Sequence, residues 1–566
     1  MSMRRRAFLA QASAASLLAA CAAPSRLPAL AAGTRPNILV IMADDLGYSD
    51  LGTMGGEIPT PHLDALAGEG RVLTAMYASP LPISRGTLLT GADHHIIGYG
   101  SMGPPAGRQV GKPGYERRLN DRARTIATLL RGSGYRTYMA GVWGLGAAPE
   151  ADPSARGFEQ SFALIEAAAD YFPIEAERLR LETMTYRQNG AQVAQPDRYV
   201  TDVYTDRMIG FIDANASDLA PFFAYLPYSA PHFPLQAHPD FIDRFKGAYD
   251  AGYDAIRLAR IARQRASGVI AADFKPAQPV PESDGFKSWA SLTPEERRIE
   301  ARRMEVYAAM VANLDWNIGR LIAYLKRIGR YDNTFILFAS GNGAASAWST
   351  RRLPENVDNS LANMGRRHSW ISYTERWAEV SNAPLSMWKT RMTEGGISVP
   401  TIVRLPRGAG VHEPIRAPAT FADVAPTLLE LAGLPRPQND GAAPLEGVSL
   451  LPLLEGRATR AHSEDAVFAD EMNGEAFVRR GRWKASLLAT ADPGDALRAE
   501  EIAALARGDL VRSSEVRARF PRVWHLFDIE GDRGETTDVS AAHPDILAAL
   551  RADFSAYRER VGVVDP

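Results

Sequence analysis

Blocks of hydrophobic residues alternate with amphipathic segments along most of the chain. Continuous apolar runs predict buried strands, and the clearest of these runs cover residues 37–43, 135–140, 221–226 and 333–339. Apolar residues at helical spacing predict helices between them, over residues 61–68, 123–130 and 294–328. Strands that alternate with helices in this way predict an α/β fold, in which a mainly parallel sheet is covered by helices on both faces.

The composition of the chain changes near residues 456–465, which are polar and rich in arginine. Short strand-like runs follow, and a final amphipathic segment closes the chain; these cover residues 466–469, 475–479, 483–487, 524–527 and 544–558. Closely spaced strands before one helix predict a small antiparallel sheet with a helix packed on it. We therefore expect an α/β domain over residues 35–460 and a small α+β subdomain over residues 461–566.

The first 34 residues have the character of a targeting segment. Residues 4–6 are arginines ahead of a weakly apolar run that is rich in Ala and Ser, which resembles a twin-arginine export signal. The run is too short for a permanent transmembrane helix. Leu18-Ala-Ala-Cys21 resembles a lipoprotein box, which would attach the mature chain to the outer membrane through Cys21. Cleavage after Ala29-Leu30-Ala31 is the alternative, and both predict an exported, periplasmic protein.

Composition narrows the classes of partner and of covalent cross-link. The chain has 566 residues, 46% of them hydrophobic, which is enough for a large core. Its net charge of −2 gives no electrostatic basis for a nucleic-acid partner. Its one cysteine lies in the targeting segment, so the mature chain has no internal disulfide.

Two adjacent acids follow the first predicted strand. Asp44 and Asp45 come directly after the apolar run 37–43. Ligands of open α/β sheets bind at the carboxyl ends of the strands, and hard cations prefer carboxylate oxygens. The pair is therefore a candidate cation site, although an acidic pair after a strand also serves as a helix cap or turn.

Residues 78–100 carry the most informative motif of the chain. Ser84 and Arg85 precede Leu88-Leu-Thr-Gly91, an arrangement that resembles the active-site signature of the sulfatase family. That signature reads Cys or Ser, any residue, Pro, Ser or Thr, Arg, two variable residues and then Leu-Leu-Thr-Gly. The run Asp93-His94-His95 resembles bacterial arylsulfatases in particular. Residues 524–535 resemble the C-terminal subdomain of sulfatases, so the resemblance covers nearly the whole mature chain.

The resemblance implies an alkaline-phosphatase-like fold and a metal-dependent site. Sulfatases use a divalent cation, usually Ca²⁺, and an aldehyde residue, formylglycine, that is made from the signature cysteine. The family positions of the metal ligands correspond to Asp44, Asp45 and Asn342 in this chain. The motif Asp-Asn-Gly that supplies the last two ligands in the family reads Gly341-Asn-Gly here.

The resemblance also implies three residues that surround the reacting sulfate. Arg85 matches the arginine that orients the nucleophile, His232 the histidine that protonates the leaving oxygen, and Lys389 a lysine that binds sulfate. Taken singly, each has a structural alternative. His232 could be a packed loop histidine, Lys389 a solvated lysine, and Arg85 a buried partner of an acid.

Five residues depart from the family pattern, and all five stand at chemical positions. Leu81 occupies the position of the nucleophile, and Ile83 that of the signature proline. Val142 and Gly144 replace the lysine and the histidine of Gly-Lys-Trp-His-Leu-Gly, and Gly341 replaces an acidic metal ligand. Without a cysteine at position 81, no formylglycine is expected.

We therefore expect an exported arylsulfatase-like protein that is catalytically degenerate and binds a sulfated or other anionic small molecule. The ligands lost at positions 81 and 341 predict weak or absent Ca²⁺ binding. Arg85 is then expected to lie against Asp44 or Asp45 as a substitute cation. The alternative is a working sulfate or phosphate ester hydrolase with a non-standard nucleophile; the nearby hydroxyls belong to Ser79, Ser84 and Thr87.

Overall fold

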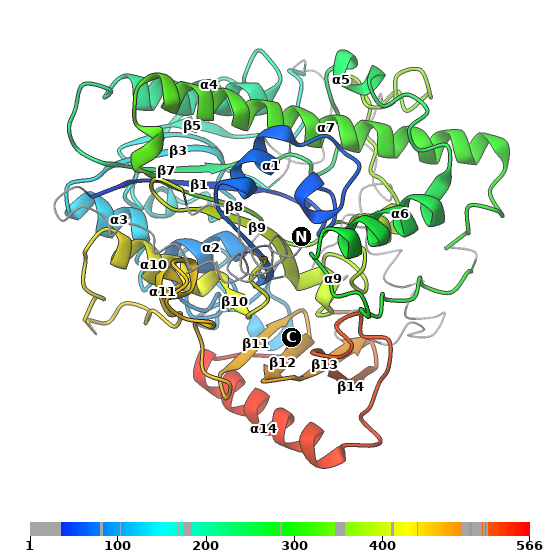
Figure 1. Cartoon of the computed structure of the whole chain (residues 1–566). Coiled ribbons are helices and arrows are strands. Elements are labelled where there is room, and N and C mark those ends of the chain that lie inside the picture. Colours follow the sequence, from blue (N-terminus) through cyan, green and yellow to red (C-terminus); the bar gives the residue numbers. More distant parts are fainter. Residues whose placement is uncertain are drawn as a thin grey trace, which may run out of the picture. The chain divides into compact units, whose positions relative to one another are not determined.

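The computed structural model (Figure 1) describes residues 35–79, 83–101, 103–167, 169–174, 184–283, 286–345, 357–408, 413–438, 440–489 and 519–565, together with residues 497, 500, 512, 515 and 516. The predicted export signal and Leu81 lie outside the described residues. Residues 35–566 form one compact unit. The domain boundary expected at residue 460 stays a prediction.

A ten-stranded mixed sheet forms the centre of this unit, with the strand order β10-β2-β9-β8-β1-β7-β3-β4-β5-β6. Five neighbouring strands run parallel: β8 (Thr334–Ser340), β1 (Asn37–Ala43), β7 (Phe222–Pro227), β3 (Arg136–Val142) and β4 (Gln160–Leu164). The flanking strands are β2 (Arg71–Tyr77), β9 (Ser398–Arg404), β10 (Ala419–Thr420), β5 (Tyr186–Gln188) and β6 (Ala191–Val193). All seven residues of β1 are buried, as its continuous apolar run predicts.

Helices cover both faces of this sheet, as predicted. Figure 1 shows α1 (Pro61–Gly68), α4 (Val200–Asp213) and α7 (Pro294–Arg327) on one face. The other face carries α2 (Ser84–Thr90), α3 (Ile126–Gly132) and α10 (Val424–Leu431). The other described helices of four or more residues that precede the C-terminal sheet are α5 (Pro239–Asp243), α6 (Gly252–Ala266), α8 (Glu375–Ser381), α9 (Glu394–Ile397) and α11 (Leu451–Leu454). Among the described helices, none has the length and apolarity needed to cross a membrane.

The long helix α7 begins and ends where its sequence predicts. Thr293 accepts a hydrogen bond from the backbone N–H of Glu296, whose side chain accepts one from the backbone N–H of Thr293. This reciprocal cap, with Pro294 in the first turn, fixes the start of the helix. Lys326 and Arg327 stand in the last turn, where positive charge is favourable.

The C-terminal residues form a second, antiparallel sheet in the order β11-β12-β13-β14. Its strands are β11 (Val467–Met472), β12 (Glu475–Arg480), β13 (Trp483–Ala489) and β14 (Arg522–Asp528), and α14 (Pro544–Val561) packs against it. The alternating residues Ala476 and Val478 of β12 are fully buried beneath Phe554 of the helix. The predicted small α+β unit is confirmed.

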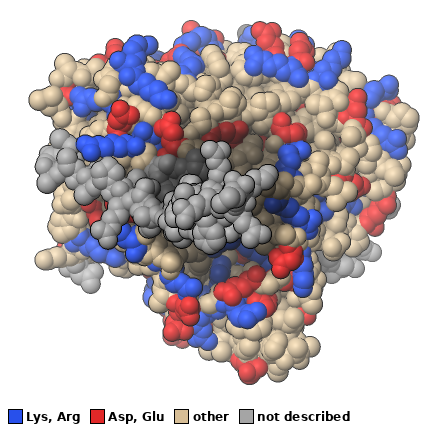
Figure 2. Space-filling model, in the orientation of Figure 1, with Lys and Arg blue, Asp and Glu red and all other residues tan. Residues whose placement is uncertain are grey.

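Charged side chains of both signs are interspersed over the described part of the face in Figure 2. This mixture agrees with the net charge of −2. The described part of this face therefore has no large patch of one charge.

Candidate functional site

The carboxyl ends of the parallel strands bring the predicted site residues to one edge of the large sheet. Asp44 and Asp45 follow β1, and Asn342 follows β8, which is hydrogen-bonded to β1 in parallel register. His232 lies on the segment that leaves β7, the other neighbour of β1. Residues far apart in the sequence meet here because adjacent parallel strands end at the same edge.

Arg85 and Asp44 form a buried ion pair. Arg85 Nη2 lies 2.5 Å from Asp44 Oδ2, and both side chains are 1% exposed. Burial alone would raise the pKa of Asp44, but the charge of Arg85, followed by the neighbouring Lys389 and His232, outweighs it and holds that pKa below its ordinary value. The expectation that Arg85 lies against one of the two acids is confirmed.

Asp45 is the meeting point of three further site residues. Its Oδ1 atom accepts hydrogen bonds from Lys389 Nζ at 2.6 Å and from Asn342 Nδ2 at 2.8 Å. His232 Nε2 lies 3.6 Å from its other carboxylate oxygen. Asp45 itself has a φ of +67°, a left-handed conformation that is costly for a residue other than glycine. The structure therefore brings together all six surviving residues that the sequence singled out.

Several buried polar atoms of this cluster have no hydrogen-bond partner among the described residues. They are Asp44 Oδ1, Asp45 Oδ2, Asn342 Oδ1, Arg85 Nε and Arg85 Nη1. Buried polar atoms in folded proteins are normally hydrogen-bonded. Three oxygens without a donor suit a hard divalent cation, and two guanidinium nitrogens without an acceptor suit an anion. The donor set therefore fits the kind of metal that the fold family implies.

The replaced positions differ in how much room they leave. A Cβ atom at Gly341 would meet nothing closer than 3.5 Å, which is an ordinary contact. Gly144 has a φ of +67°, and a Cβ there would lie 3.1 Å from Arg85 Nη1. Val142 is fully buried at the end of β3. An aspartate fits at position 341 without backbone strain, whereas a histidine at position 144 meets both strain and crowding.

Two of the nearby hydroxyls are already engaged. Ser84 Oγ donates to the carbonyl oxygen of Gly341 at 2.6 Å. Ser79 Oγ donates to Asp470 Oδ2 at 2.7 Å, and Asp470 Oδ1 lies 2.7 Å from His94 Nε2. A carboxylate that already binds a histidine is a poor base for removing a hydroxyl proton. The arrangement therefore gives Ser79 a partner and little activation.

The Asp93-His94-His95 run forms a compact cluster whose potential ligand atoms lie within 4.8 Å of one another. His95 uses both ring nitrogens, with Nδ1 3.0 Å from Asp93 Oδ1 and Nε2 3.1 Å from Glu471 Oε2. Burial alone would lower the pKa of His95, but these two carboxylates raise it to about 10. An imidazolium whose two ring nitrogens are both protonated and hydrogen-bonded has no lone pair for a metal. The cluster instead ties β11 to the segment that follows α2.

A cavity of about 640 Å³ opens beside this cluster, between Thr87 of α2 and the C-terminal sheet. Its ionisable lining is already paired. Glu446 pairs with Arg560, and His462 Nε2 lies 2.8 Å from Asp423 Oδ2. Among the other lining groups, Thr87 Oγ1 has no hydrogen-bond partner in the described part of the chain.

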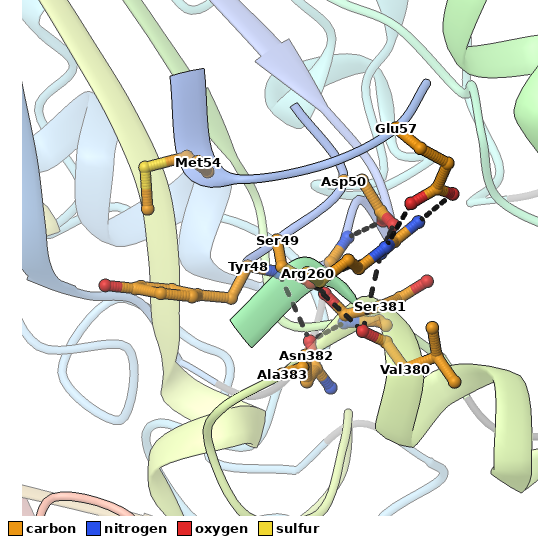
Figure 3. A network of polar contacts seen from close by, with 12 residues as sticks. Tyr48, Ser49, Asp50, Met54, Glu57, Arg260, Val380, Ser381, Asn382 and Ala383 are labelled. Atoms are coloured by element: carbon orange, nitrogen blue, oxygen red, sulfur yellow. Dashed lines mark hydrogen bonds and ion pairs between the residues drawn. The ribbon is translucent and has the colours of Figure 1, made fainter. Parts of the chain in front are cut away.

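A second buried network supports the segment that leaves Asp45. Figure 3 shows Arg260, from α6, between Glu57 and Asp50. Its guanidinium is fully buried and lies 2.7 Å from both Glu57 oxygens and 2.6 Å from Asp50 Oδ1. Asp50 Oδ2 accepts hydrogen bonds from the backbone N–H of Gly47 and from Tyr307 Oη. Sequence reasoning missed this network because Arg260 lies about 200 residues from Asp50 and Glu57, and no local pattern links them.

Comparisons with known proteins agree on one family. The family model described as Sulfatase matches residues 36–434. An uncharacterized sulfatase of Schizosaccharomyces pombe is 36% identical over 562 residues, covering 94% of both chains. An arylsulfatase of Klebsiella aerogenes is 41% identical over 431 residues, covering 74% of this chain and 91% of the arylsulfatase. The solved structure of Ps i-CgsB is 25% identical, covers 93% of both chains and has a TM-score of 0.63.

Proposed function

Because the chain belongs to the sulfatase family of hydrolases, we propose that it is a degenerate member that binds a sulfated or other anionic small molecule. Arg85, His232 and Lys389 are the proposed anion-binding groups. The observation that carries the proposal is Leu81, because a hydrocarbon side chain stands where the family has its nucleophile. A leucine has no lone pair with which to attack sulfur, and it cannot be converted to formylglycine.

The engaged hydroxyls support the loss of hydrolysis. Ser84 donates a hydrogen bond to a backbone carbonyl. Ser79 donates a hydrogen bond to a carboxylate that is also hydrogen-bonded to His94. The lysine and histidine that the family places near the sulfate are Val142 and Gly144 here. Nucleophile, base and one sulfate-binding cation are therefore all replaced.

A divalent cation would be held by Asp44, Asp45 and Asn342. These residues offer three oxygens without a hydrogen-bond donor in the described part of the chain. Ca²⁺ prefers about six to eight oxygen ligands, so we propose weak binding. When bound, the cation would neutralise the oxygens of an anionic ligand; His232, Arg85 and Lys389 would orient that ligand.

The charges of the cluster predict that anion binding depends on the cation. Asp44 and Asp45 are balanced by Arg85 and Lys389, so these four side chains sum to zero. Relative to the family pattern, the chain has lost one carboxylate at Gly341 and one ammonium at Val142, and these losses cancel. A divalent cation would add two positive charges next to Arg85. An anion should therefore bind more tightly when the cation is present.

The test is a calorimetric titration of the mature protein with CaCl₂ and with Na₂SO₄, separately and in sequence. The proposal predicts Ca²⁺ binding weaker than micromolar and sulfate binding that strengthens in the presence of Ca²⁺. Arg85→Ala should abolish the sulfate heat. Absence of sulfate binding under all conditions would contradict the proposal.

The alternative is a working ester hydrolase, and the contact between Ser79 and Asp470 gives it a specific candidate nucleophile. It predicts turnover of an aryl sulfate or an aryl phosphate that disappears in Ser79→Ala. The matched control is Ser84→Ala, which removes a neighbouring hydroxyl that donates to a backbone carbonyl. Turnover lost only in Ser79→Ala would replace the first proposal.

The location of the protein is a separate proposal, which rests on the sequence alone. We propose export by the twin-arginine route into the periplasm, with lipidation of Cys21 as one outcome and cleavage near Ala31 as the other. Cell fractionation tests it. Replacement of Arg5 and Arg6 by lysine should leave the protein in the cytoplasm, and Cys21→Ser should release it from membranes only if Cys21 is lipidated.

A further inference from the structure

One buried amide connects three segments of the site. Asn382 directly follows α8 and is 0% exposed. Its Oδ1 atom accepts hydrogen bonds from the backbone N–H of Ala344 at 3.0 Å and of Tyr48 at 3.4 Å, the latter drawn in Figure 3. Its Nδ2 atom donates to the carbonyl oxygen of Met387 at 3.0 Å. A single planar group therefore joins three separate stretches of chain.

Each of these stretches carries one residue of the proposed site. Tyr48 lies three residues after Asp45, Ala344 two residues after Asn342, and Met387 two residues before Lys389. The side chains of Asn342 and Lys389 meet at Asp45 Oδ1, at 2.8 and 2.6 Å. The described hydrogen bonds of the Asn382 side chain go to the backbone beside each of these three residues.

The segment that bears Lys389 needs such support. Met387 and Thr390 both have positive φ angles, of +61° and +79°. Such conformations are unfavourable for residues other than glycine and persist only when surrounding contacts hold them. Several described contacts hold this segment. Two of them act at or beside these residues: the bond from Asn382 to Met387, and a bond from Lys389 N to the carbonyl oxygen of Ala344 at 2.9 Å. Removing the amide donor of Asn382 removes the described hydrogen bond to the carbonyl oxygen of Met387 itself.

We propose that Asn382 is a positioning residue that sets the placement of Lys389 relative to Asp45 and Asn342. Its consequence for ligand binding rests on the proposed function. Its consequence for the geometry of the cluster does not. Asn382 acts through the backbone of three segments, and its own side chain stays buried away from the ligand.

The variant Asn382→Asp isolates this role. Aspartate has the same shape and keeps both acceptor contacts, but it replaces the donor to Met387 with an oxygen that repels the carbonyl. The matched control is Asn37→Asp. Asn37 is 1% exposed at the opposite end of β1, where its side chain accepts from Phe222 N at 3.2 Å and donates to Thr334 Oγ1 at 3.4 Å.

Sulfate titration in the presence of CaCl₂ gives the first readout. Groups that orient the neighbours of a ligand typically change affinity about 10- to 100-fold, and we expect a loss of this size in Asn382→Asp. Asn37→Asp should bind sulfate like the wild type, even where the two variants lose similar amounts of thermal stability. Equal sulfate affinity in Asn382→Asp and the wild type would overturn the proposal, and so would an equal loss in both variants.

Crystal structures of the wild type and of Asn382→Asp give a readout that needs no ligand. We expect Lys389 Nζ to leave Asp45 Oδ1 in the variant, and the unchanged contact would overturn the proposal. If wild-type protein binds no sulfate, the proposed function fails, and this contact alone decides the role of Asn382. If Asn382→Asp does not fold, the neutral variant Asn382→Ser is judged by the same contact.

Discussion

Two buried clusters of charged residues lie on either side of the segment that carries Lys389, and they differ in how completely they are paired. The junction cluster joins this segment to the C-terminal sheet and consists of Glu394, Lys484, Arg533 and Glu535. Lys484 Nζ lies 3.1 Å from Glu394 and 2.9 Å from Glu535, and Arg533 Nε lies 2.8 Å from Glu394. Glu535 also accepts hydrogen bonds from Ser386 Oγ and from the backbone N–H of Glu394.

The site cluster, which consists of Asp44, Asp45, Arg85, Asn342 and Lys389, is equally buried and less complete. Five of its polar atoms have no hydrogen-bond partner among the described residues, whereas none of the junction cluster is in this condition. A fully paired buried network stabilises one structure, and leaving buried polar atoms unpaired costs free energy. The comparison indicates that the junction cluster is structural and that the site cluster is shaped for a ligand.

The largest effect is expected from removing the central cation of each cluster in turn. Lys484→Met leaves Glu394 and Glu535 buried without their shared partner, and it should lower the free energy of unfolding by about 3–5 kcal/mol. Lys389→Met should cost less, because Asp45 keeps its bond from Asn342. Lys389→Met should instead weaken sulfate binding. Chemical denaturation and calorimetry check both variants, and the reverse pattern would show that the roles of the clusters are exchanged.

The histidine cluster should make stability depend on pH. The pKa of His95 is raised from 6.5 to about 10, since Asp93 and Glu471 favour its charged form although burial opposes it. Its contribution is therefore fully present below pH 6.5 and is lost as the pH rises toward 10, at about 1.4 kcal/mol per pKa unit. Denaturation curves should show this decline.

His95→Gln should flatten that decline, because the titrating group is gone. The control is His525→Gln, which removes a half-exposed histidine paired with Asp538 and should leave the slope unchanged. A slope that survives in His95→Gln would mean that other groups control the pH dependence.

Rebuilding the family pattern should cost stability at two positions: Val142, which is fully buried, and Gly144, which has a positive φ. The set is Leu81→Cys, Ile83→Pro, Val142→Lys, Gly144→His and Gly341→Asp, expressed with a formylglycine-generating enzyme. Gly144→His should cost about 1–2 kcal/mol at its positive φ. Ile83→Pro fits the observed φ of −63°. The combined variant should show some aryl sulfate hydrolysis and no single change should, because such residues act as a unit.

A folded fivefold variant that binds Ca²⁺ but stays inert would show divergence beyond these five positions. That result would leave the difference in pairing between the two clusters unaffected. It would contradict the hypothesis that the sulfatase scaffold is preserved outside these five positions.

The smallest expected effect tests whether the carboxylate and amide oxygens without a hydrogen-bond donor among the described residues are metal ligands. Gly341→Asp should tighten Ca²⁺ binding by about tenfold, because a fourth hard ligand joins Asp44, Asp45 and Asn342. Leu219→Asp, at a position that is 92% exposed, controls for the added charge. Calorimetric titration of both variants checks this, and equal gains would show that overall charge, and not coordination, is responsible.

Much of the fold followed from local pattern. The strand and helix expected at residues 37–43 and 61–68 have those bounds, because a buried parallel strand is continuously apolar and the helix starts at a proline. β5 and β6 were missed because they are short and largely polar. α6 was missed because four arginines interrupt its apolar residues.

Some of the site residues could also be predicted from the sequence, and others could not. Resemblance to a family located Asp44, Arg85 and Lys389, and their convergence is confirmed. Asn382 and Arg260 were not found, because their importance lies in hydrogen bonds to backbone groups and acids hundreds of residues away. No local composition signals a contact of that kind. Glu535 was noticed only as part of a C-terminal motif, and its place in the junction cluster emerges from the fold.

The central claim is that this sulfatase-family chain has lost sulfate ester hydrolysis. The most direct measurement is turnover of an aryl sulfate by the mature protein with saturating CaCl₂, beside Arg85→Ala, each produced with and without a formylglycine-generating enzyme. The account predicts no turnover above the Arg85→Ala control and no effect of the enzyme, because position 81 is leucine. Turnover by the wild type that disappears in Arg85→Ala would contradict it.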